Sequence, residues 1–450
     1  MMRRPAWRAF VLYISMTLVL LWPLLPAFAR AFPQDTGDPV LNTWLLAWSA
    51  RHMPLTTSWW NAGMFYPMPN AMALSELLIG LLPMTLPVQW LTGNATLAYN
   101  VAFALSFPLC AMAAYALALE LTGRAEYAFV AGLAYAFAPY RAMQLGHVQV
   151  LSYYWAPLAL LGLHRYLNTG RRSSLALFAV AWLLQVLTNG YALFHLSLLL
   201  ALWVVWFVRS RRMCIDIAAA WALAALPLLP ILWTYWRVHH ALHLTRDINS
   251  TKMFSLELTD SLHVSTELLL LGGRLGIPRA EAGAFPGITL LVVALVSGLV
   301  YWRVRKKPAP SAFTLDQRVV MVVSVVAALV ALSAVILGPW RVGPLTVTEF
   351  RKPFSIAVYA AAYVALRGAT VRRGYAARSV WMFYALAMVA MYVLALGPEP
   401  RLFGQPVLYK SPYTWLMGLP GVNEFRVPAR FVMLAVLCQS MLLAAAMEFL

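Results

Sequence analysis

Two carboxylates stand three residues apart, soon after the first apolar segment of the chain. Asp35 and Asp38 lie in the run 32–39, where glycine and proline favour a turn. A pair of acids held in a turn can supply a general base or bind a divalent cation. The same run also fits a plainer role, an Asx-type turn followed by the N-cap of a helix over residues 40–53. Spacing alone leaves both interpretations open.

Three other polar residues border apolar segments and are candidates for the same site. Glu76 stands near the start of an apolar stretch at 74–91, where it is either a charge at a helix cap or an acid of a buried site. His147 and Gln149 belong to the polar run 139–149. A histidine flanked by glutamines can bind a metal or a phosphate, although a lone histidine in a polar turn can also be an ordinary hydrogen-bonded residue. We take Glu76 as a candidate catalytic residue and the other two as candidates for substrate binding.

Basic residues near the ends of apolar segments are candidates for binding a phosphate or pyrophosphate. The planar guanidinium group of arginine binds such oxygens in a bidentate manner, whereas anchoring to lipid headgroups explains the same positions equally well. Pro428 is best tolerated in a first helical turn, so a helix is expected to begin near Val427. Free backbone N–H groups in that turn add positive potential. The candidates are Arg141, Arg351, Lys352, Arg426 and Arg430.

Composition shows what kind of element must position these residues. Of the 450 residues, 62% are hydrophobic and only 11% are charged, and the mean hydropathy is +0.71. Soluble domains carry roughly a quarter charged residues, so this composition excludes a soluble enzyme, a secreted disulfide scaffold and a disordered chain. The three cysteines lie far apart without metal-ligand spacing. Repeated apolar runs near the length of ~20 residues that spans a bilayer predict transmembrane helices.

We predict an all-α fold, a polytopic transmembrane helical bundle of about twelve spans in a single domain, residues 1–450. The stretch 74–91 is interrupted by Gly80, Pro83 and Pro87, and we expect that it does not cross. The predicted spans are 9–30, 98–121, 125–140, 151–167, 172–188, 190–208, 214–234, 287–302, 318–338, 354–368, 379–397 and 430–449.

The distribution of charge sets the expected orientation. With 74–91 outside the membrane, 19 of the 34 basic residues but only 5 of the 16 acidic residues fall on the cytoplasmic side. The positive-inside rule therefore places both termini in the cytoplasm. The net charge of +18 then reflects topology signals and contacts with anionic membrane lipids, so no nucleic-acid partner is expected. The apolar run at 10–29 is longer than the core of a secretory signal, which favours a retained first helix.

The longest loops are expected outside, at residues 31–97, 235–286 and 398–429. The first of them is predicted to carry interfacial helices, because apolar residues recur at helical spacing within 40–53. The remaining 11 acidic residues lie on this outer side, and the spans themselves are almost free of charge. Ion pumps and channels usually keep ionisable residues inside their spans. The pattern favours chemistry or binding at the outer membrane–water boundary.

These features together resemble the GT-C superfamily of integral-membrane glycosyltransferases, which use polyprenyl-phosphate-linked sugars. The strings GDPVLNTWLLAW, GLAYAFAPYRAMQLGHVQ and FRVPARF look like those of a group of uncharacterised bacterial GT-C-like membrane proteins. The resemblance implies a long first external loop whose acid is catalytic or binds metal. His147 and Gln149 stand where the best-known members carry an acidic pair. Chemistry without a metal or other cofactor is therefore favoured over a divalent-cation mechanism.

The leading hypothesis is a glycosyltransferase at the outer face of the bacterial cytoplasmic (inner) membrane. The donor is a sugar on a polyprenyl phosphate, the acceptor is a glycan, lipid or protein, and Asp38, or else Asp35, acts as general base. We expect Asp38 to face a cavity shared with Glu76 and His147, where partial burial raises its basicity. The alternative is a non-enzymatic binder or translocase of lipid-linked glycans. A solute transporter has less support, because the predicted spans lack buried ion pairs.

Overall fold

The computed structural model describes residues 4–244, 246–268, 270–276, 279, 281–304 and 313–449. Within these ranges the chain is mostly helical, in agreement with the predicted all-α class. Strand structure is confined there to two short antiparallel hairpins. In the first, β1 (Trp340–Val342) pairs with β2 (Leu345–Val347), and in the second, β3 (Arg401–Leu402) pairs with β4 (Gln405–Pro406).

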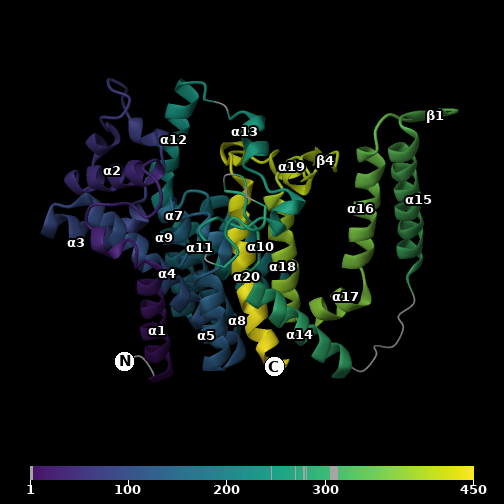
Figure 1. Cartoon of the computed structure of the whole chain (residues 1–450), viewed down its shortest axis with the longest axis horizontal. Helices are drawn as coiled ribbons and strands as arrows, with labels where there is room; N and C mark the ends of the chain where they lie inside the picture. Colours follow the sequence, from purple (N-terminus) through teal and green to yellow (C-terminus); the bar gives the residue numbers. More distant parts are fainter. Residues whose placement is uncertain are drawn as a thin grey trace.

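A bundle of closely packed helices forms the core of the molecule (Figure 1). Helix α4 packs against α3, α5 and α8, while α20 packs against α5 and α18. A Cβ atom on Gly132 of α5 would lie 2.7 Å from the carbonyl oxygen of Ala111 on α4, so only glycine allows this approach. The bundle consists of α3 (Leu82–Thr92), α4 (Ala95–Thr122), α5 (Ala125–Ala136), α8 (Trp155–Thr169), α9 (Arg172–Thr188), α10 (Ala192–Phe207), α18 (Val380–Ala395) and α20 (Val432–Ala446).

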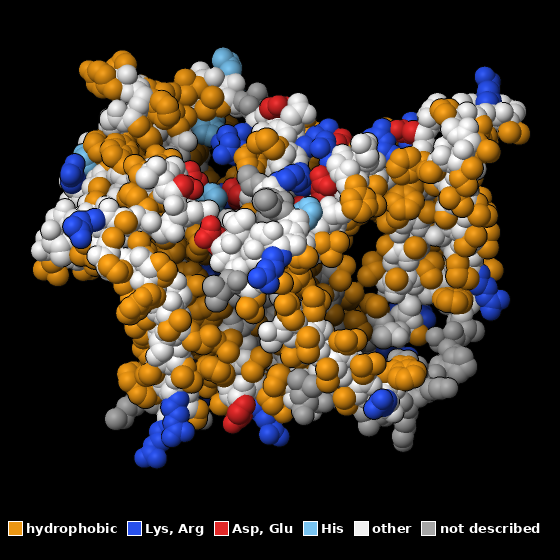
Figure 2. Space-filling view, viewed as in Figure 1, with side chains coloured by type: hydrophobic (Ala, Val, Ile, Leu, Met, Phe, Trp, Pro, Cys, Tyr) orange, Lys and Arg blue, Asp and Glu red, His pale blue; other side chains and the backbone are white. Residues whose placement is uncertain are grey.

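Further helices surround this bundle. Helices α15 and α16 pack against each other as a hairpin, which stands apart from the bundle on the right of Figure 1. Figure 2 shows a gap between this hairpin and the bundle, bordered by hydrophobic side chains. The surrounding helices are α1 (Arg4–Leu20), α11 (Arg211–Ala225), α12 (Leu229–Ala241), α14 (Ile288–Val304), α15 (Leu315–Leu337), α16 (Arg351–Leu366) and α17 (Ala369–Ala376).

The described residues contain four helices that are long and apolar enough to cross a membrane, or up to five if the bent pair α16–α17 counts as one span. The four are Ala95–Thr122, Arg211–Ala241, Leu315–Leu337 and Pro428–Ala446. Several of the other predicted spans form shorter apolar helices, because the chain turns before about 20 residues are reached. The predicted first span is one example: its helix ends at Leu20, before Pro23 and Pro26. A membrane location is compatible with these helices, and the number of twelve spans stays a prediction.

The first predicted external loop folds against one end of α4 as a series of short helices. Helix α2 (Asp38–Arg51) packs on α3 and α4 and leaves Val40, Leu41 and Trp44 exposed, as an interfacial helix requires. The stretch 74–91 is not one long helix, because the backbone at Leu78 is left-handed (φ 55°) and α3 has only 11 residues. The 3₁₀ turns of this region are η1 (Leu25–Ala27), η2 (Thr57–Trp60), η3 (Ala71–Leu74) and η4 (Ile79–Leu81).

Short elements from distant parts of the chain gather at the end of the bundle opposite to the two termini. Figure 1 shows both termini at the bottom and helices α2, α12, α13 and α19 near the top. Most of the acidic and histidine side chains visible in Figure 2 also lie in this upper part.

The remaining short elements of the chain are α6 (Pro139–Ala142), α7 (Val148–Leu151), α13 (Ile248–Met253), α19 (Pro412–Leu416), η5 (Leu226–Leu228), η6 (Leu258–Leu262), η7 (Val422–Glu424), η8 (Pro428–Phe431) and η9 (Met447–Phe449).

Candidate functional site

The two aspartates of the first loop have different local roles. Asp35 closes an Asx turn, since its Oδ1 accepts a hydrogen bond of 2.8 Å from the backbone N–H of Gly37. Gly37 is the N-cap of α2, and Asp38 is the first residue of that helix rather than its cap. The side chain of Asp38 is therefore free of local backbone bonds and is 52% exposed. A carboxylate at this position is also stabilised by the positive end of the helix dipole.

His147, from the polar run 139–149, lies against Asp38. Its Nε2 lies 3.0 Å from Oδ2 of Asp38 and 3.7 Å from Oε1 of Glu281. Its Nδ1 is buried and has no hydrogen-bond partner among the described residues. The tautomer with the proton on Nε2 is therefore favoured, and this proton is donated to Asp38. The expected proximity of Asp38 and His147 is thus present in the structure.

A buried arginine joins two further carboxylates to this pair. Arg430 binds Glu281 in a bidentate manner, with Nε 2.7 Å from Oε2 and the second nitrogen 3.1 Å from Oε1. Its remaining nitrogen lies 3.5 Å from Oε1 of Glu76. The guanidinium also stacks over the ring of Tyr191, 4.5 Å from its centroid. Arg430 is only 8% exposed, so its charge is largely satisfied within the protein.

Amide side chains connect Glu76 back to helix α2. Gln149 acts to lower the pKa of Glu76, and its Oε1 accepts a bond of 3.2 Å from Nδ2 of Asn42. Asn42 lies one helical turn after Asp38, on the same face of α2. These contacts define a polar cluster from five segments of the chain: Asp38, Asn42, Glu76, His147, Gln149, Glu281 and Arg430.

The hydrogen bond from His147 holds the pKa of Asp38 below its ordinary value of 3.8. Partial burial acts in the opposite direction but is the smaller effect, and the positive charges of Arg430 and Arg426 lower the pKa further. The prediction that Asp38 is more basic than usual is therefore wrong in its net direction: burial acts to raise the pKa, as expected, but the hydrogen bond from His147 outweighs it. The structure instead keeps this carboxylate ionised.

The two other acids of the polar cluster differ from each other. Burial acts to raise the pKa of Glu281, but the charge and hydrogen bonds of Arg430 outweigh it and leave this pKa below 4.5. Burial raises the pKa of Glu76 above 4.5, since the longer contact with Arg430 does not compensate for it. Oε2 of Glu76 is buried and without a partner among the described residues. The pKa values of these two carboxyl groups thus move in opposite directions, and only Glu281 has the bidentate contact with Arg430.

The other predicted residues have separate environments. Arg141 is 1% exposed and donates to the carbonyl oxygen of Leu151 (2.8 Å) and to Ser106 (3.3 Å) inside the bundle. Arg351 and Lys352 both contact Glu349 at the start of α16, which Figure 1 shows on the opposite side of the molecule from α2. Neither environment belongs to the polar cluster.

Arg426 remains the exposed cation near Asp38. Its guanidinium stacks over the ring of Phe254, 5.2 Å from the centroid, and no acidic side chain lies within 4 Å of it among the described residues. Its charge contributes to the lowered pKa of Asp38. The helix predicted near Val427 is confirmed, since η8 begins at Pro428 and leads directly into α20.

Glu281 and Asn42 were not found by sequence reasoning. Asn42 carried a usable signal, because it follows Asp38 by four residues on a predicted helix. Glu281 stands alone among small residues in a long loop, and nothing in its local sequence connects it to Arg430, 149 residues later. Comparisons with protein-family models, curated proteins and solved structures find no match for this chain. Among the described residues, no three His, Cys, Asp or Glu side chains form a group suited to hold a metal ion.

Proposed function

We propose that this chain is a glycosyltransferase that transfers a sugar from a polyprenyl-phosphate donor to an acceptor at the outer face of the cytoplasmic membrane. The observation that carries this proposal is the half-exposed, ionised Asp38, held by His147 beside the buried Glu281–Arg430 pair. This arrangement offers one accessible base, Asp38, beside polar side chains that contact one another. Membrane helices below it are compatible with a lipid-linked donor.

In the proposed reaction, Asp38 accepts the proton of an acceptor hydroxyl group. The acceptor oxygen attacks the anomeric carbon of the donor sugar as the bond from this carbon to the phosphate oxygen breaks. The electron pair of that bond leaves with the phosphate. Arg426 is the cation proposed to stabilise this leaving group, because it is exposed and near Asp38, whereas the charge of Arg430 is already compensated by Glu281. Positioning of the acceptor supplies much of the remaining acceleration.

An apolar cavity of about 450 Å³ supports the assignment of a lipid-linked donor. It lies between α3, α4, α8 and α9, and its lining includes Gly80, Met84, Leu109 and Trp155. Gly80 follows Glu76 of the polar cluster by only four residues. We propose that part of the polyprenyl chain occupies this cavity, while its phosphate remains near the polar cluster.

The test is a transfer assay with purified protein and polyprenyl-phosphate sugars, in which Asp38→Asn is compared with wild type. Loss of a general base is expected to lower kcat by about 10²–10⁴-fold while donor binding persists. The matched control is Glu399→Gln, which removes a carboxylate that pairs with Lys252 and lies outside the polar cluster. If Asp38→Asn keeps the wild-type rate, Asp38 is not the base, and Asp35→Asn is then compared in the same assay.

The same experiment separates the enzyme from a non-enzymatic binder or translocase of lipid-linked glycans. A binder would retain donor and release no transferred product in wild type, and Asp38→Asn would change affinity alone. Transfer by wild type together with its loss in Asp38→Asn supports the enzyme. Absence of transfer with every lipid-linked sugar that binds contradicts it.

A further inference from the structure

Glu281 is a member of the polar cluster that lies in a loop, outside any helix or strand. Its backbone has φ of 60°, in the left-handed region that residues other than glycine seldom adopt. Such a conformation persists only where the surrounding contacts fix it. The loop that carries Glu281 must therefore be held firmly on both sides for the carboxylate to reach Arg430 and His147.

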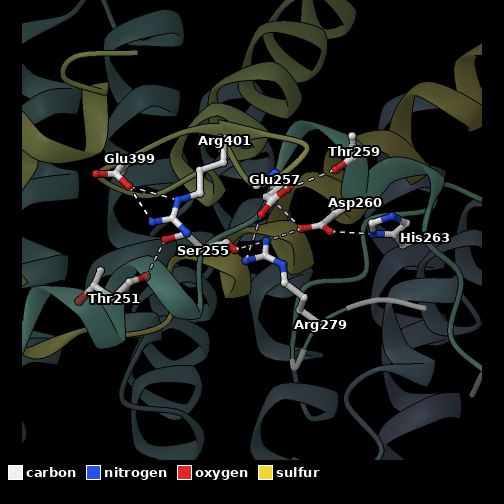
Figure 3. Close-up of polar contacts among 10 residues, drawn as sticks. Thr251, Ser255, Glu257, Thr259, Asp260, His263, Arg279, Glu399 and Arg401 are labelled. Carbon is white, nitrogen blue, oxygen red and sulfur yellow. Dashed lines mark hydrogen bonds and ion pairs between the residues drawn. The ribbon is translucent and has the colours of Figure 1, made fainter. Parts of the chain in front are cut away.

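Asp260 provides contacts on both sides of Glu281. Before it, the guanidinium of Arg279 lies 3.1 Å from Oδ2 of Asp260. After it, the backbone N–H of Ala284 donates to the carbonyl oxygen of Asp260 over 3.1 Å. The two contacts bracket a six-residue segment, 279–284, with Glu281 inside it. Figure 3 shows Arg279 reaching toward Glu257, Asp260 and Ser255 from this segment.

Asp260 is itself strongly fixed. Its side chain is fully buried, and Oδ2 also accepts a bond of 2.6 Å from the backbone N–H of Glu257. Its Oδ1 lies 3.0 Å from Nδ1 of His263. Arg279 adds a bond to the carbonyl oxygen of Ser255 and a contact of 3.5 Å with Glu257. A buried carboxylate with this many donors cannot shift without losing several bonds at once.

Residues 254–260, which include Asp260, also contact the chain beside Arg430, the other partner of the salt bridge. The carbonyl oxygen of Phe254 accepts a bond of 3.1 Å from the backbone N–H of Ala429, the residue before Arg430. Residues 254–260 thus contact the chain next to Arg430 and the loop around Glu281. Both ends of the Glu281–Arg430 salt bridge are fixed to one short segment.

We propose that Asp260 and Arg279 are positioning residues for the Glu281–Arg430 pair and, through Glu281, for the hydrogen bond between His147 and Asp38. Neither residue belongs to the polar cluster, and each acts through the loop 279–284. The consequence for turnover rests on the proposed function, whereas the consequence for the loop does not.

The experiment compares wild type with Asp260→Asn and Arg279→Gln in the full chain, using hydrogen–deuterium exchange of peptides that contain residues 281–284. Loss of the charge-assisted contact is expected to speed exchange at Ala284 by at least about tenfold, without a matching increase in the helical bundle. Arg279→Lys, which keeps the charge, should restore part of the protection. The matched control is Glu399→Gln, which removes a contact with Lys252 and the contact with Arg401 shown in Figure 3. Glu399 touches neither Asp260 nor Arg279. Exchange at 281–284 in this control should equal that of wild type.

Unchanged exchange at 281–284 in both variants would overturn the proposal, and so would a uniform increase throughout the chain. In the transfer assay, Arg279→Gln is expected to lower kcat by about tenfold or more while the KM for donor stays within about twofold, since misplacement of a positioned group affects the chemical step. A rise in KM alone contradicts the positioning role. If wild type transfers no sugar, the proposed function fails, and the exchange measurement still decides whether Asp260 and Arg279 position the loop.

Discussion

Replacement of Glu281 by glutamine tests the central salt bridge of the polar cluster. The side chains of Glu281 and Arg430 are each only 9% exposed, and they share two charge-assisted hydrogen bonds of 2.7 and 3.1 Å. Removing one partner of a buried pair leaves an uncompensated charge and costs about 3–5 kcal/mol. Glutamine keeps one acceptor oxygen and Glu76 stays nearby, so we expect the lower end, about 3 kcal/mol.

The assay is thermal unfolding of purified Glu281→Gln in detergent. Unfolding entropy of roughly 2.1 cal/mol/K per residue, summed over 450 residues, converts 3 kcal/mol into a fall in Tm of about 3 °C. Glu399→Gln is the control, because its carboxylate is 21% exposed and its partners Lys252 and Arg401 are 26% and 33% exposed. Solvent screening limits the loss there to about 1 kcal/mol or less, and to about 1 °C in Tm.

A double variant makes the reasoning refutable. Arg430→Met combined with Glu281→Gln removes both charges, and replacement of a buried pair by uncharged groups is often neutral. We therefore expect the double variant to be more stable than either single variant. If its loss of stability equals the sum of the two single losses, the two side chains do not interact as the structure indicates.

Three further predictions follow from single residues. Glu76→Gln should be at least as stable as wild type at pH 7. Burial raises the folded-state pKa of Glu76 above 4.5, so protonated Glu76 contributes its full stabilisation at a pH below the unfolded-state pKa. This contribution is lost as the pH rises through the folded-state pKa. Denaturant titrations at pH 4 and pH 7 measure this, and a loss above about 1 kcal/mol at pH 7 would contradict it. Arg141→Met should lower the free energy of unfolding by about 2–3 kcal/mol, because the carbonyl oxygen of Leu151 loses its charged donor inside the bundle; an unchanged Tm would show that this bond is unimportant. Thr92→Cys should react with a membrane-impermeant maleimide from outside intact cells, whereas Arg171→Cys, also exposed in the structure, should react only after permeabilisation, and the reverse pattern would overturn the predicted orientation.

Local sequence determined the framework that carries the site. Asp35, Gly37 and Pro39 specify a turn and a helix start within a few residues, and the structure has both. Pro428 likewise marks the start of the last helix. Within 74–91, Pro83 stands in the first turn of the short helix α3. Each of these outcomes depends on backbone preferences that act over a few residues, so they can be read without knowledge of the fold.

Composition also determined the apolar, helical character of the chain, but it did not determine where helices end. Four or five helices among the described residues reach spanning length, and several other apolar segments form shorter helices because the chain turns within them. Hydropathy measures how apolar a segment is, and it contains no information on the partner against which the segment packs.

Only the tertiary structure decided which polar residues meet and what their charges do. Arg426 and Arg430 look equivalent as phosphate ligands in the sequence, yet Arg430 is buried against Glu281 and Arg426 is exposed. The pKa of Asp38 is lowered instead of raised because the hydrogen bond from His147, 109 residues later, outweighs partial burial. Such outcomes depend on distances of 3–4 Å between side chains from separate segments, and Coulomb and hydrogen-bond energies change steeply over that range. The residue types that can do chemistry are therefore written in the sequence, whereas their partners and protonation are set by how the distant loops pack.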